Sequence, residues 1–404
     1  MKTVVLAAGE GKRLRPLTSN RPKVMLPVAN QPILEHILLN AKHAGLKEFV
    51  IVVSYKKDSI VDYFGDGKKF GIDIEYVDQL EPLGTAHAIS TIEEFVDDYF
   101  VVLSGDTLLS SKEIRKLSKL KSIALGVKKY TNTEEYGTVE IRKEKITKIV
   151  EKTKASTSPY INLGVYVFNQ TIFDSIKSIE QSKRGEFEIT DAIQHLIEKR
   201  KKVTALFLDE WMDASRPWDL FSLNEFLLRD LKTDIRGEIE KRVTLKGAIR
   251  IGKGTRILAG TYIEGSVIIG EDCRIGPNCY LRPFTSIGNN CHVGNACEVK
   301  NSIIMNHTNI PHHNYMGDTI IGEHCNLGAG TKIANLRLDK KLIYSTIGGQ
   351  KISTGRVKLG AIIGDYVQIG INANINVGTI IGNRCYIGPG ALVNGEIASS
   401  SKIM

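Results

Sequence analysis

The stretch V-I-I-G-E-D-C-R-I-G-P-N-C-Y-L-R-P-F-T-S-I-G (267–288) decides the fold of the second half of the chain. Apolar residues return in it at every sixth position, and the same step continues on both sides. The positions that share this step are Ile251, Ile257, Ile263, Ile269, Ile275, Leu281, Ile287, Val293 and Val299, then Ile321, Leu327 and Ile333, then Ile363, Ile369, Ile375, Ile381, Ile387 and Val393. Neither an α-helix nor an alternating strand has this period, whereas a parallel β-helix does. The sequence therefore predicts stacked coils that bury one continuous core.

Glycine follows many of the apolar positions, and the rhythm is interrupted by I-P-H-H-N-Y-M-G-D (310–318), which we interpret as an insertion. The repeats resemble the hexapeptide-repeat family. That resemblance implies a left-handed β-helix with three repeats in each coil. It also implies a homotrimer with active sites between neighbouring β-helices.

All six cysteines lie in the repeat region, each four residues after an apolar repeat position. They could be metal ligands, disulfide partners on stacked coils, or buried free thiols. No C-x-x-C pair supports a zinc site, although coils stacked about 4.8 Å apart would permit a disulfide. We favour buried thiols that act as small apolar side chains. The cysteines are Cys273, Cys279, Cys291, Cys297, Cys325 and Cys385.

The first half of the chain follows a different pattern, in which apolar strands alternate with helical segments. Strands are expected at 3–9, 48–54 and 99–106, and helical spacing is found at 32–45. This alternation predicts an α/β domain with a mostly parallel sheet covered on both faces. Ligands of such sheets bind beyond the carboxyl ends of the strands. We place the boundary between the two domains at residue 232, which gives domains 1–232 and 233–404.

The segment L-A-A-G-E-G-K-R-L-R-P-L-T (6–18), followed by R-P-K (21–23), lies at the end of the first expected strand. It is not a dinucleotide fingerprint, because Leu14 stands where a third glycine is needed. Over roughly residues 1–230 the chain resembles the sugar nucleotidylyltransferases, which implies a Rossmann-like nucleotidyltransferase domain. These enzymes join a sugar 1-phosphate to a nucleoside triphosphate and release pyrophosphate. The attacking phosphate is already an anion, so the reaction needs charge neutralisation, positioning and a metal rather than a base.

This resemblance implies a role for several residues. Arg13 and Lys23 would be catalytic, since they would hold the triphosphate and its developing charge. Asp106 and Asp213 would bind Mg²⁺, a hard cation that prefers oxygen ligands. The residues implied to contact the nucleotide are Leu6, Ala8, Gly9, Gly11, Gln79, Gly84 and Thr85. The residues implied to contact the sugar phosphate are Gly137, Glu151, Lys152 and Asn162.

Polar residues in the repeat region point to a second site. Over nearly its whole length the chain resembles an archaeal type of the bifunctional N-acetylglucosamine-1-phosphate uridylyltransferases/glucosamine-1-phosphate acetyltransferases. The resemblance implies that His312 is the general base for acetyl transfer, a task that suits an unperturbed pKa of about 6.5. Ala329 would offer its N–H to the thioester of acetyl-CoA. The residues implied to bind the amino-sugar phosphate are Arg282, Lys300, Tyr315, Asn326, Asn335 and Lys340.

The two resemblances together predict a bifunctional enzyme. It would use UTP or dTTP with a sugar 1-phosphate such as N-acetylglucosamine 1-phosphate, and acetyl-CoA with glucosamine or galactosamine 1-phosphate. One alternative is a glucose- or mannose-1-phosphate nucleotidylyltransferase whose β-helix only assembles or regulates. Another is a catalytically silent subunit that regulates a partner.

The composition agrees with a metabolic enzyme. The net charge of +9 is spread along the chain without a nucleic-acid-binding motif, so it indicates a lysine-rich surface and anion-binding pockets. No apolar run approaches the roughly 20 residues that cross a bilayer, and the N-terminus lacks the features of a signal peptide. We expect a cytoplasmic protein that binds neither nucleic acid nor membranes.

Overall fold

The computed structural model describes residues 1–131, 133–152 and 158–404. These residues form two compact units, each with its own buried core. The first unit consists of Met1–Glu10, Pro22–Met25 and Ile33–Asp213. The second consists of Gly11–Arg21, Leu26–Pro32 and Ala214–Met404. No helix in the described part of the chain is long and apolar enough to cross a membrane.

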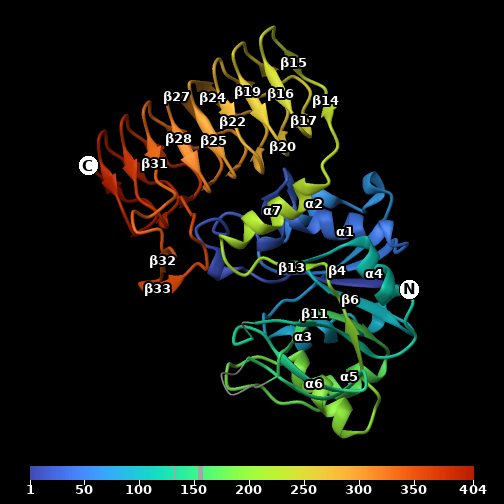
Figure 1. Ribbon diagram of the computed structural model, residues 1–404. Helices are drawn as coiled ribbons and strands as arrows, with labels where there is room; N and C mark the ends of the chain where they lie inside the picture. Colours follow the sequence, from blue (N-terminus) through green and yellow to red (C-terminus); the bar gives the residue numbers. More distant parts are fainter. Residues whose placement is uncertain (132, 153–157) are drawn as a thin grey trace. The chain divides into compact units, whose positions relative to one another are not determined.

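The first unit is built on a nine-stranded sheet (Figure 1). The order across the sheet is β5 (Asp73–Asp78), β4 (Glu48–Val53), β1 (Thr3–Leu6), β6 (Phe100–Ser104), β11 (Tyr160–Phe168), β8 (Ala124–Lys129), β12 (Thr204–Phe207), β10 (Lys145–Val150) and β9 (Thr138–Arg142). β5, β4, β1 and β6 are parallel, but β11 runs antiparallel to both β6 and β8. The sheet is therefore mixed, but only β11 and β10 run against the other seven strands, so the expectation of a mostly parallel sheet holds with these two exceptions. Alternating strands and helices reveal crossovers, but they do not reveal the direction of a strand that later fills the gap between two of them.

Helices pack on this sheet and complete its core. They are α1 (Ile33–His43), α2 (Asp58–Phe64), α3 (Thr85–Ser90), α4 (Ser111–Ser118), α5 (Thr171–Ile176) and α6 (Ile189–Glu198). On α5 and α6, Phe173 and Ile193 are fully buried in one apolar cluster with Val4 and Phe100 of the sheet. A short two-stranded sheet, β7 (Thr107–Leu109) with β13 (Trp211–Asp213), lies beyond the end of β6.

The second unit contains a parallel β-helix whose strands join three sheets in turn (Figure 1). The first sheet is β14 (Asp234–Ile235), β17 (Ile249–Ile251), β20 (Val267–Ile269), β23 (Thr285–Ile287), β26 (Ile303–Ile304), β29 (Ile320–Ile321), β34 (Ala361–Ile363), β37 (Thr379–Ile381) and β40 (Glu396–Ile397). The second sheet is β15 (Glu238–Ile239), β18 (Arg256–Ile257), β21 (Arg274–Ile275), β24 (His292–Asn295), β27 (Asn309–His312), β30 (Asn326–Leu327), β35 (Gln368–Ile369), β38 (Tyr386–Ile387) and β41 (Lys402–Ile403). The third sheet is β16 (Thr244–Lys246), β19 (Tyr262–Glu264), β22 (Tyr280–Leu281), β25 (Glu298–Lys300), β28 (Tyr315–Gly317), β31 (Lys332–Ile333), β36 (Asn374–Ile375) and β39 (Leu392–Val393). One strand from each sheet makes one coil.

Strand register gives the length of each coil. Ile251 pairs with Ile269 and Ile269 pairs with Ile287, so these coils repeat every 18 residues. Ile287 pairs with Ile304 and Ile304 pairs with Ile321, so the next two coils repeat every 17 residues. The apolar repeat positions form one buried column through the coils, as the six-residue period predicts.

Segment 310–318 is part of the coils, so the prediction of an insertion there is wrong. Ile310 on β27 and Met316 on β28 are fully buried core positions. The rhythm shifts because the step from Val299 to Ile304, and then the step from Met316 to Ile321, spans five residues instead of six. The true insertion is 334–360, between β31 and β34. It carries a hairpin of β32 (Tyr344–Ile347) and β33 (Gln350–Ser353).

Segments outside the coils complete the second unit. They include α7 (Asp219–Arg229) and the short strands β2 (Pro27–Val28) and β3 (Gln31–Pro32). Asn224 of α7 donates a hydrogen bond to the Phe284 carbonyl at 2.8 Å and accepts one from the Ser286 hydroxyl at 2.7 Å. These two bonds fasten α7 to the β-helix.

The six cysteines are all buried and free, as we expected. Burial raises the pKa of Cys279 and of Cys325 to about 12, even though hydrogen bonds from backbone groups act in the opposite direction. Both thiols therefore stay protonated near neutral pH and serve as core side chains.

Candidate active sites

The first candidate site lies at the carboxyl end of β6 in the first unit. Asp106 follows β6 after Gly105, where a Cβ atom would lie only 2.6 Å from the Leu6 carbonyl oxygen. The Lys23 ammonium forms an ion pair and hydrogen bond with the Asp106 carboxylate. Burial acts to raise the pKa of Asp106, but the Lys23 charge and the hydrogen bonds to the carboxylate outweigh it and hold that pKa below its ordinary value. The site therefore presents an ionised carboxylate.

Strand pairing brings Asp213 to the same place. β13 runs antiparallel to β7, and Asp213 lies opposite Thr107, the neighbour of Asp106 in the chain. The Tyr136 hydroxyl donates a hydrogen bond to the Asp213 carboxylate at 3.0 Å. Two neighbouring carboxylates suit Mg²⁺, which commonly takes one or two carboxylates and completes its shell with phosphate oxygens and water. Among the described residues no group of three or more His, Cys, Asp or Glu side chains could hold a metal by itself.

Gln79, Gly84 and Thr85 lie near one another in the first unit, where Gly84 directly precedes α3. The Gln79 side chain is buried and donates a hydrogen bond to the Gly84 carbonyl at 3.2 Å. Gly84 has a φ of +111°, and a Cβ atom there would lie 2.6 Å from the Phe187 carbonyl oxygen, so the position requires glycine. The Thr85 hydroxyl accepts the Ile189 N–H at 3.1 Å.

Gly137, Glu151 and Asn162 are also brought together in the first unit. The Asn162 N–H donates to the Gly137 carbonyl at 2.8 Å, and a Cβ atom on Gly137 would lie 3.4 Å from the Glu151 carboxylate. The Thr190 hydroxyl donates to Glu151 at 3.2 Å. The Asn162 side chain accepts the Gly164 N–H at 2.9 Å. This cluster combines one carboxylate with amide and hydroxyl groups, which suits a polyhydroxylated ligand.

Two charged residues of this cluster were not expected from the sequence. The Arg184 guanidinium donates to Glu151 at 3.2 Å and to Glu188 at 2.5 Å. The available signal was the charged run R-G-E-F-E-I-T-D (184–191), which leads into the first turn of α6 and looks like an ordinary polar connection. Lys152 lies beside the same network, with its ammonium 3.9 Å from Glu151.

The segment 6–18, which carries Gly9 and Gly11, is shared between the two units. Leu6 ends β1, and Ala8 and Gly9 follow it in the first unit. Gly11, in the second unit, has a φ of +74° and precedes the 3₁₀ turn Lys12–Leu14 that carries Arg13. A left-handed residue at this point lets the chain turn sharply and leaves the Arg13 side chain exposed.

The second candidate site is centred on a buried carboxylate in the β-helix. Asp318 accepts hydrogen bonds from the Lys300 ammonium at 3.1 Å and the Asn335 amide at 2.6 Å on one oxygen, and from the Asn301 amide at 2.7 Å on the other. The Tyr315 hydroxyl donates to Asn335 at 3.3 Å. Three of the residues expected to bind the amino sugar, namely Lys300, Tyr315 and Asn335, are therefore joined in one network within one chain.

Asp318 also closes the neck of the insertion 334–360. Its carbonyl accepts the Gly360 N–H at 2.8 Å, while the Leu359 N–H donates to the Asn335 carbonyl at 3.0 Å. The insertion, which carries Lys340, is thus fastened to the coil at both of its ends. Asp318 was missed in the sequence because an aspartate after glycine reads as a turn residue.

Arg282 lies on the same side of the β-helix as this network. Its guanidinium donates to Glu298 at 3.0 Å and lies 5.5 Å from the centre of the Tyr280 ring. Glu298 is in register with Tyr315 on the third sheet. Burial, together with the carboxylates of Glu298 and Asp318, raises the pKa of Tyr315, so its phenol remains a hydrogen-bond donor.

His312, Asn326 and Ala329 belong to the second sheet and its turns. His312 ends β27, has an exposed side chain, and accepts the Gly330 N–H on its carbonyl at 3.0 Å. Asn326 lies on the next coil, where it pairs in register with Asn309. Ala329 follows Asn326 in the turn after β30. In the described residues no hydrogen bond joins His312 to the Asp318 network, so His312 and the network lie on different strands without direct contact.

Comparison with known proteins gives separate family matches for the two halves of the chain. The model of the nucleotidyl transferase family matches residues 2–230, and that of the GMPPB C-terminal domain matches residues 263–358. The bifunctional protein GlmU of Methanocaldococcus jannaschii is 42% identical over 403 residues, which cover 99% of this chain and 97% of that protein. A bifunctional sugar-1-phosphate nucleotidylyltransferase/acetyltransferase of Sulfurisphaera tokodaii is 38% identical over 401 residues, 98% of each chain.

A solved structure resembles part of the chain. A sucrose complex from Bacillus anthracis, described as a glucose-1-phosphate thymidylyltransferase, is 30% identical with a TM-score of 0.52. The match covers 58% of this chain and 97% of that one. The likeness therefore concerns little more than half of the chain, whereas the archaeal relatives match it from end to end.

Proposed function

Because the chain belongs to the nucleotidyl transferase family, and within it to the bifunctional nucleotidylyltransferases/acetyltransferases, we propose that it carries out two successive reactions. The β-helix transfers an acetyl group from acetyl-CoA to the amine of glucosamine 1-phosphate or galactosamine 1-phosphate. The first half joins a sugar 1-phosphate, such as N-acetylglucosamine 1-phosphate, to the nucleotidyl group of UTP or dTTP. The observation that carries this proposal is the match to bifunctional relatives over nearly the whole chain.

In nucleotidyl transfer, a phosphate oxygen of the sugar 1-phosphate forms a bond to the α-phosphorus while the bond to pyrophosphate breaks. Asp106 and Asp213 would hold Mg²⁺, which supplies positive charge to the phosphate oxygens. Lys23, which pairs with Asp106, and Arg13 would supply positive charge to the triphosphate. The backbone N–H groups around Gly9 would face the phosphates.

The remaining parts of the first site would select the two substrates. Gln79, Gly84 and Thr85 would contact the base, and the hydrogen bonds that hold Gln79 against Gly84 and Thr85 against Ile189 support this role. The other nucleotide contacts would come from Leu6, Ala8 and Gly11. The sugar 1-phosphate would be bound by Gly137, Glu151, Lys152 and Asn162.

In acetyl transfer, the sugar ammonium first loses a proton to His312. The free amine then forms a bond to the thioester carbonyl carbon and the carbon–sulfur bond breaks. The proton that the nitrogen loses in this step passes to the leaving sulfur, so coenzyme A departs as the thiol. The Ala329 N–H would stabilise the negative charge on the carbonyl oxygen. The exposed position of His312 at the end of β27 allows it to reach a substrate.

The sugar phosphate of the acetyl acceptor would lie against Arg282 and Lys300. Tyr315, Asn326 and Asn335 would bind its hydroxyl groups, and Lys340 of the insertion would complete the pocket. The Asp318 network supports this assignment, because it holds Lys300 and Asn335 at fixed positions.

The proposal extends to the oligomeric state of the protein and to the boundary between its two domains. The hexapeptide repeats would wind as a left-handed β-helix, and three chains would form a cytoplasmic homotrimer. We keep the domain boundary at residue 232. The end of the nucleotidyl transferase match at residue 230 supports it, although α7 packs with the β-helix.

The proposal is tested by giving the purified protein acetyl-CoA, Mg²⁺, a panel of sugar phosphates and the common nucleoside triphosphates. Mass spectrometry should detect an N-acetylated sugar phosphate and a sugar nucleotide. A protein that makes sugar nucleotides but acetylates no amino sugar would instead be a nucleotidylyltransferase with a structural β-helix.

A further inference from the structure

A column of side chains runs along one corner of the β-helix, between the first and second sheets. Each member has a positive φ and donates its backbone N–H to a carbonyl of the coil before it. The members are Asp272, Asn290, His307, His324, Tyr366, Arg384 and Ser400. Because the same turn recurs in every coil, their side chains lie one above another at the spacing of the coils.

Four consecutive members of this column carry planar groups that stack. The His307 and His324 rings are 4.7 Å apart and inclined by 1°, and the His324 and Tyr366 rings are 4.9 Å apart and inclined by 6°. The Arg384 guanidinium carbon lies 4.8 Å from the centre of the Tyr366 ring. The next member is Ser400, which has no planar group, so the stack ends at Arg384.

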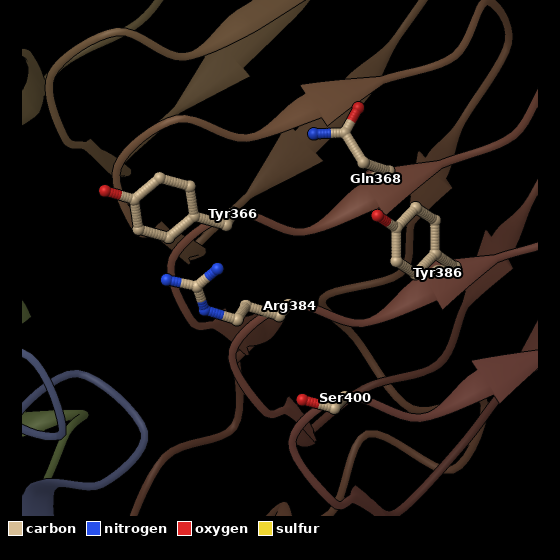
Figure 2. Close-up of a pocket in the computed structure, with 5 residues that line it drawn as sticks. All are labelled: Tyr366, Gln368, Arg384, Tyr386 and Ser400. Carbon is tan, nitrogen blue, oxygen red and sulfur yellow. The ribbon is translucent and has the colours of Figure 1, made fainter.

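The end of the stack opens into a hollow of about 640 Å³ (Figure 2). Its walls are Tyr366, Gln368, Arg384, Tyr386 and Ser400. Figure 2 shows Tyr366 and Arg384 on one side of the hollow and Gln368 and Tyr386 on the other. The column therefore faces a second exposed ring across an open space.

The hollow has the chemistry of an anion site with aromatic walls. None of the five lining residues is acidic. Lys402 is in register with Tyr386, and its ammonium lies 5.9 Å from the Tyr386 ring. Within the described ranges, neither Arg384 nor Lys402 makes a side-chain hydrogen bond or an ion pair. Two cations without counter-ions beside two exposed phenol rings favour a ligand that is both planar and negatively charged.

We propose that this hollow binds a nucleoside phosphate, separately from both reaction sites. The base occupies the level of Ser400, where it continues the stack beyond Arg384 and lies beside Tyr386. The phosphate faces Lys402. Both proposed reactions supply such ligands, since one uses uridine or thymidine phosphates and the other uses coenzyme A, which contains an adenosine 3′,5′-bisphosphate group.

The test is calorimetric titration of the full-length protein with UDP and, separately, with adenosine 3′,5′-bisphosphate. Ser400→Trp fills the open level of the stack, and Arg384→Ala removes its last planar group. Either change should weaken one class of binding sites about tenfold or more for at least one probe, since stacking supplies much of such binding. Arg384→Lys, which keeps the charge but not the plane, should lose less. Neither proposed activity should change in the absence of added effectors.

Asn290→Trp is the matched control, because it places the same side chain in the same turn at the other end of the stack, next to His307. It should leave both titrations unchanged. Loss for UDP alone assigns the site to uridine phosphates, and loss for the bisphosphate alone assigns it to adenosine nucleotides. The proposal is overturned if both probes bind Ser400→Trp and Arg384→Ala as they bind the parent protein. It is also overturned if Ser400→Trp changes the oligomeric state, because another copy of the chain would then cover this face.

Discussion

The two halves of the chain build their candidate sites in different ways. In the β-helix, residues come together because they stand one coil apart, as Lys300 and Gly317 do in register. In the first unit, Asp106 and Asp213 meet because β13 returns to pair with β7 after a long excursion of the chain. In the β-helix, the residues of a site are therefore brought together by the repeat length of the coils. In the α/β unit, they are brought together by the order in which distant strands pair. The first kind is sensitive to a single lost residue, and the second is sensitive to how distant loops return.

The largest effect is expected where topology assembles the site. Asp106→Ala should lower nucleotidyl transfer by about 10²–10³-fold or more, because it removes an ionised oxygen ligand and leaves Lys23 unpaired. Acetyl transfer should stay unchanged. Initial rates of both reactions measure this. Asp209→Ala, at an exposed aspartate close to β13, is the control and should keep both activities. Normal nucleotidyl transfer by Asp106→Ala would remove this residue from the site.

A comparable change in the β-helix should have the opposite selectivity. His312→Ala should lower acetyl transfer by about 10²–10⁴-fold, since a general base contributes a factor of this size. Nucleotidyl transfer from UTP should continue at the parent rate. His313→Asn is the matched control, because it alters the adjacent exposed histidine. If His313→Asn abolished acetylation and His312→Ala did not, the general base would be His313 and the assignment to His312 would be wrong.

A smaller effect is expected from the carboxylate that holds the second site together. Asp318→Asn should raise the KM for the amino-sugar phosphate by roughly tenfold to a hundredfold, since it weakens a charged hydrogen bond to Lys300. Asp365→Asn is the control, because Asp365 is also a buried aspartate of the β-helix and accepts the Glu323 N–H at 2.8 Å. Equal losses of acetylation in the two variants at equal Tm would indicate a purely structural role for Asp318.

Much of the β-helix could be predicted because its period repeats. The six-residue step in the sequence identifies the core positions, and these positions are buried in the structure. The same rule failed where one residue was missing after Val299, since a shift of one residue hides the next core positions, Ile304 and Ile310. A period shows that the rhythm breaks, but it does not tell a deletion from an insertion.

The first unit could be predicted less completely, for a topological reason. Strand and helix patterns located β1, β4 and β6 but not the antiparallel direction of β11. Arg184, which also binds Glu188, was missed because its partner Glu151 lies more than thirty residues away in the sequence, with no motif to link them. Contacts that depend on the return path of the chain are not encoded in local spacing.

The smallest effect is expected at the cysteines, all of which lie in the β-helix. In the folded protein at pH 8, iodoacetamide should modify Cys279 and Cys325 hardly at all, because burial raises both pKa values to about 12. Denaturation should expose all six thiols. Mass spectrometry of the alkylated protein counts the labels. Rapid labelling of the native protein would show that the coils open readily.

The central claim, that one chain holds two independent sites, is tested most directly by mixing two inactive variants. Asp106→Ala and His312→Ala proteins would be combined with glucosamine 1-phosphate, acetyl-CoA, UTP and Mg²⁺. Neither variant alone should form UDP-N-acetylglucosamine, whereas the mixture should form it, since each protein supplies the step that the other lacks. A mixture that stays inactive, while each variant keeps the partial activity expected of it, would contradict free transfer between independent sites. A variant that loses both activities would contradict their independence outright.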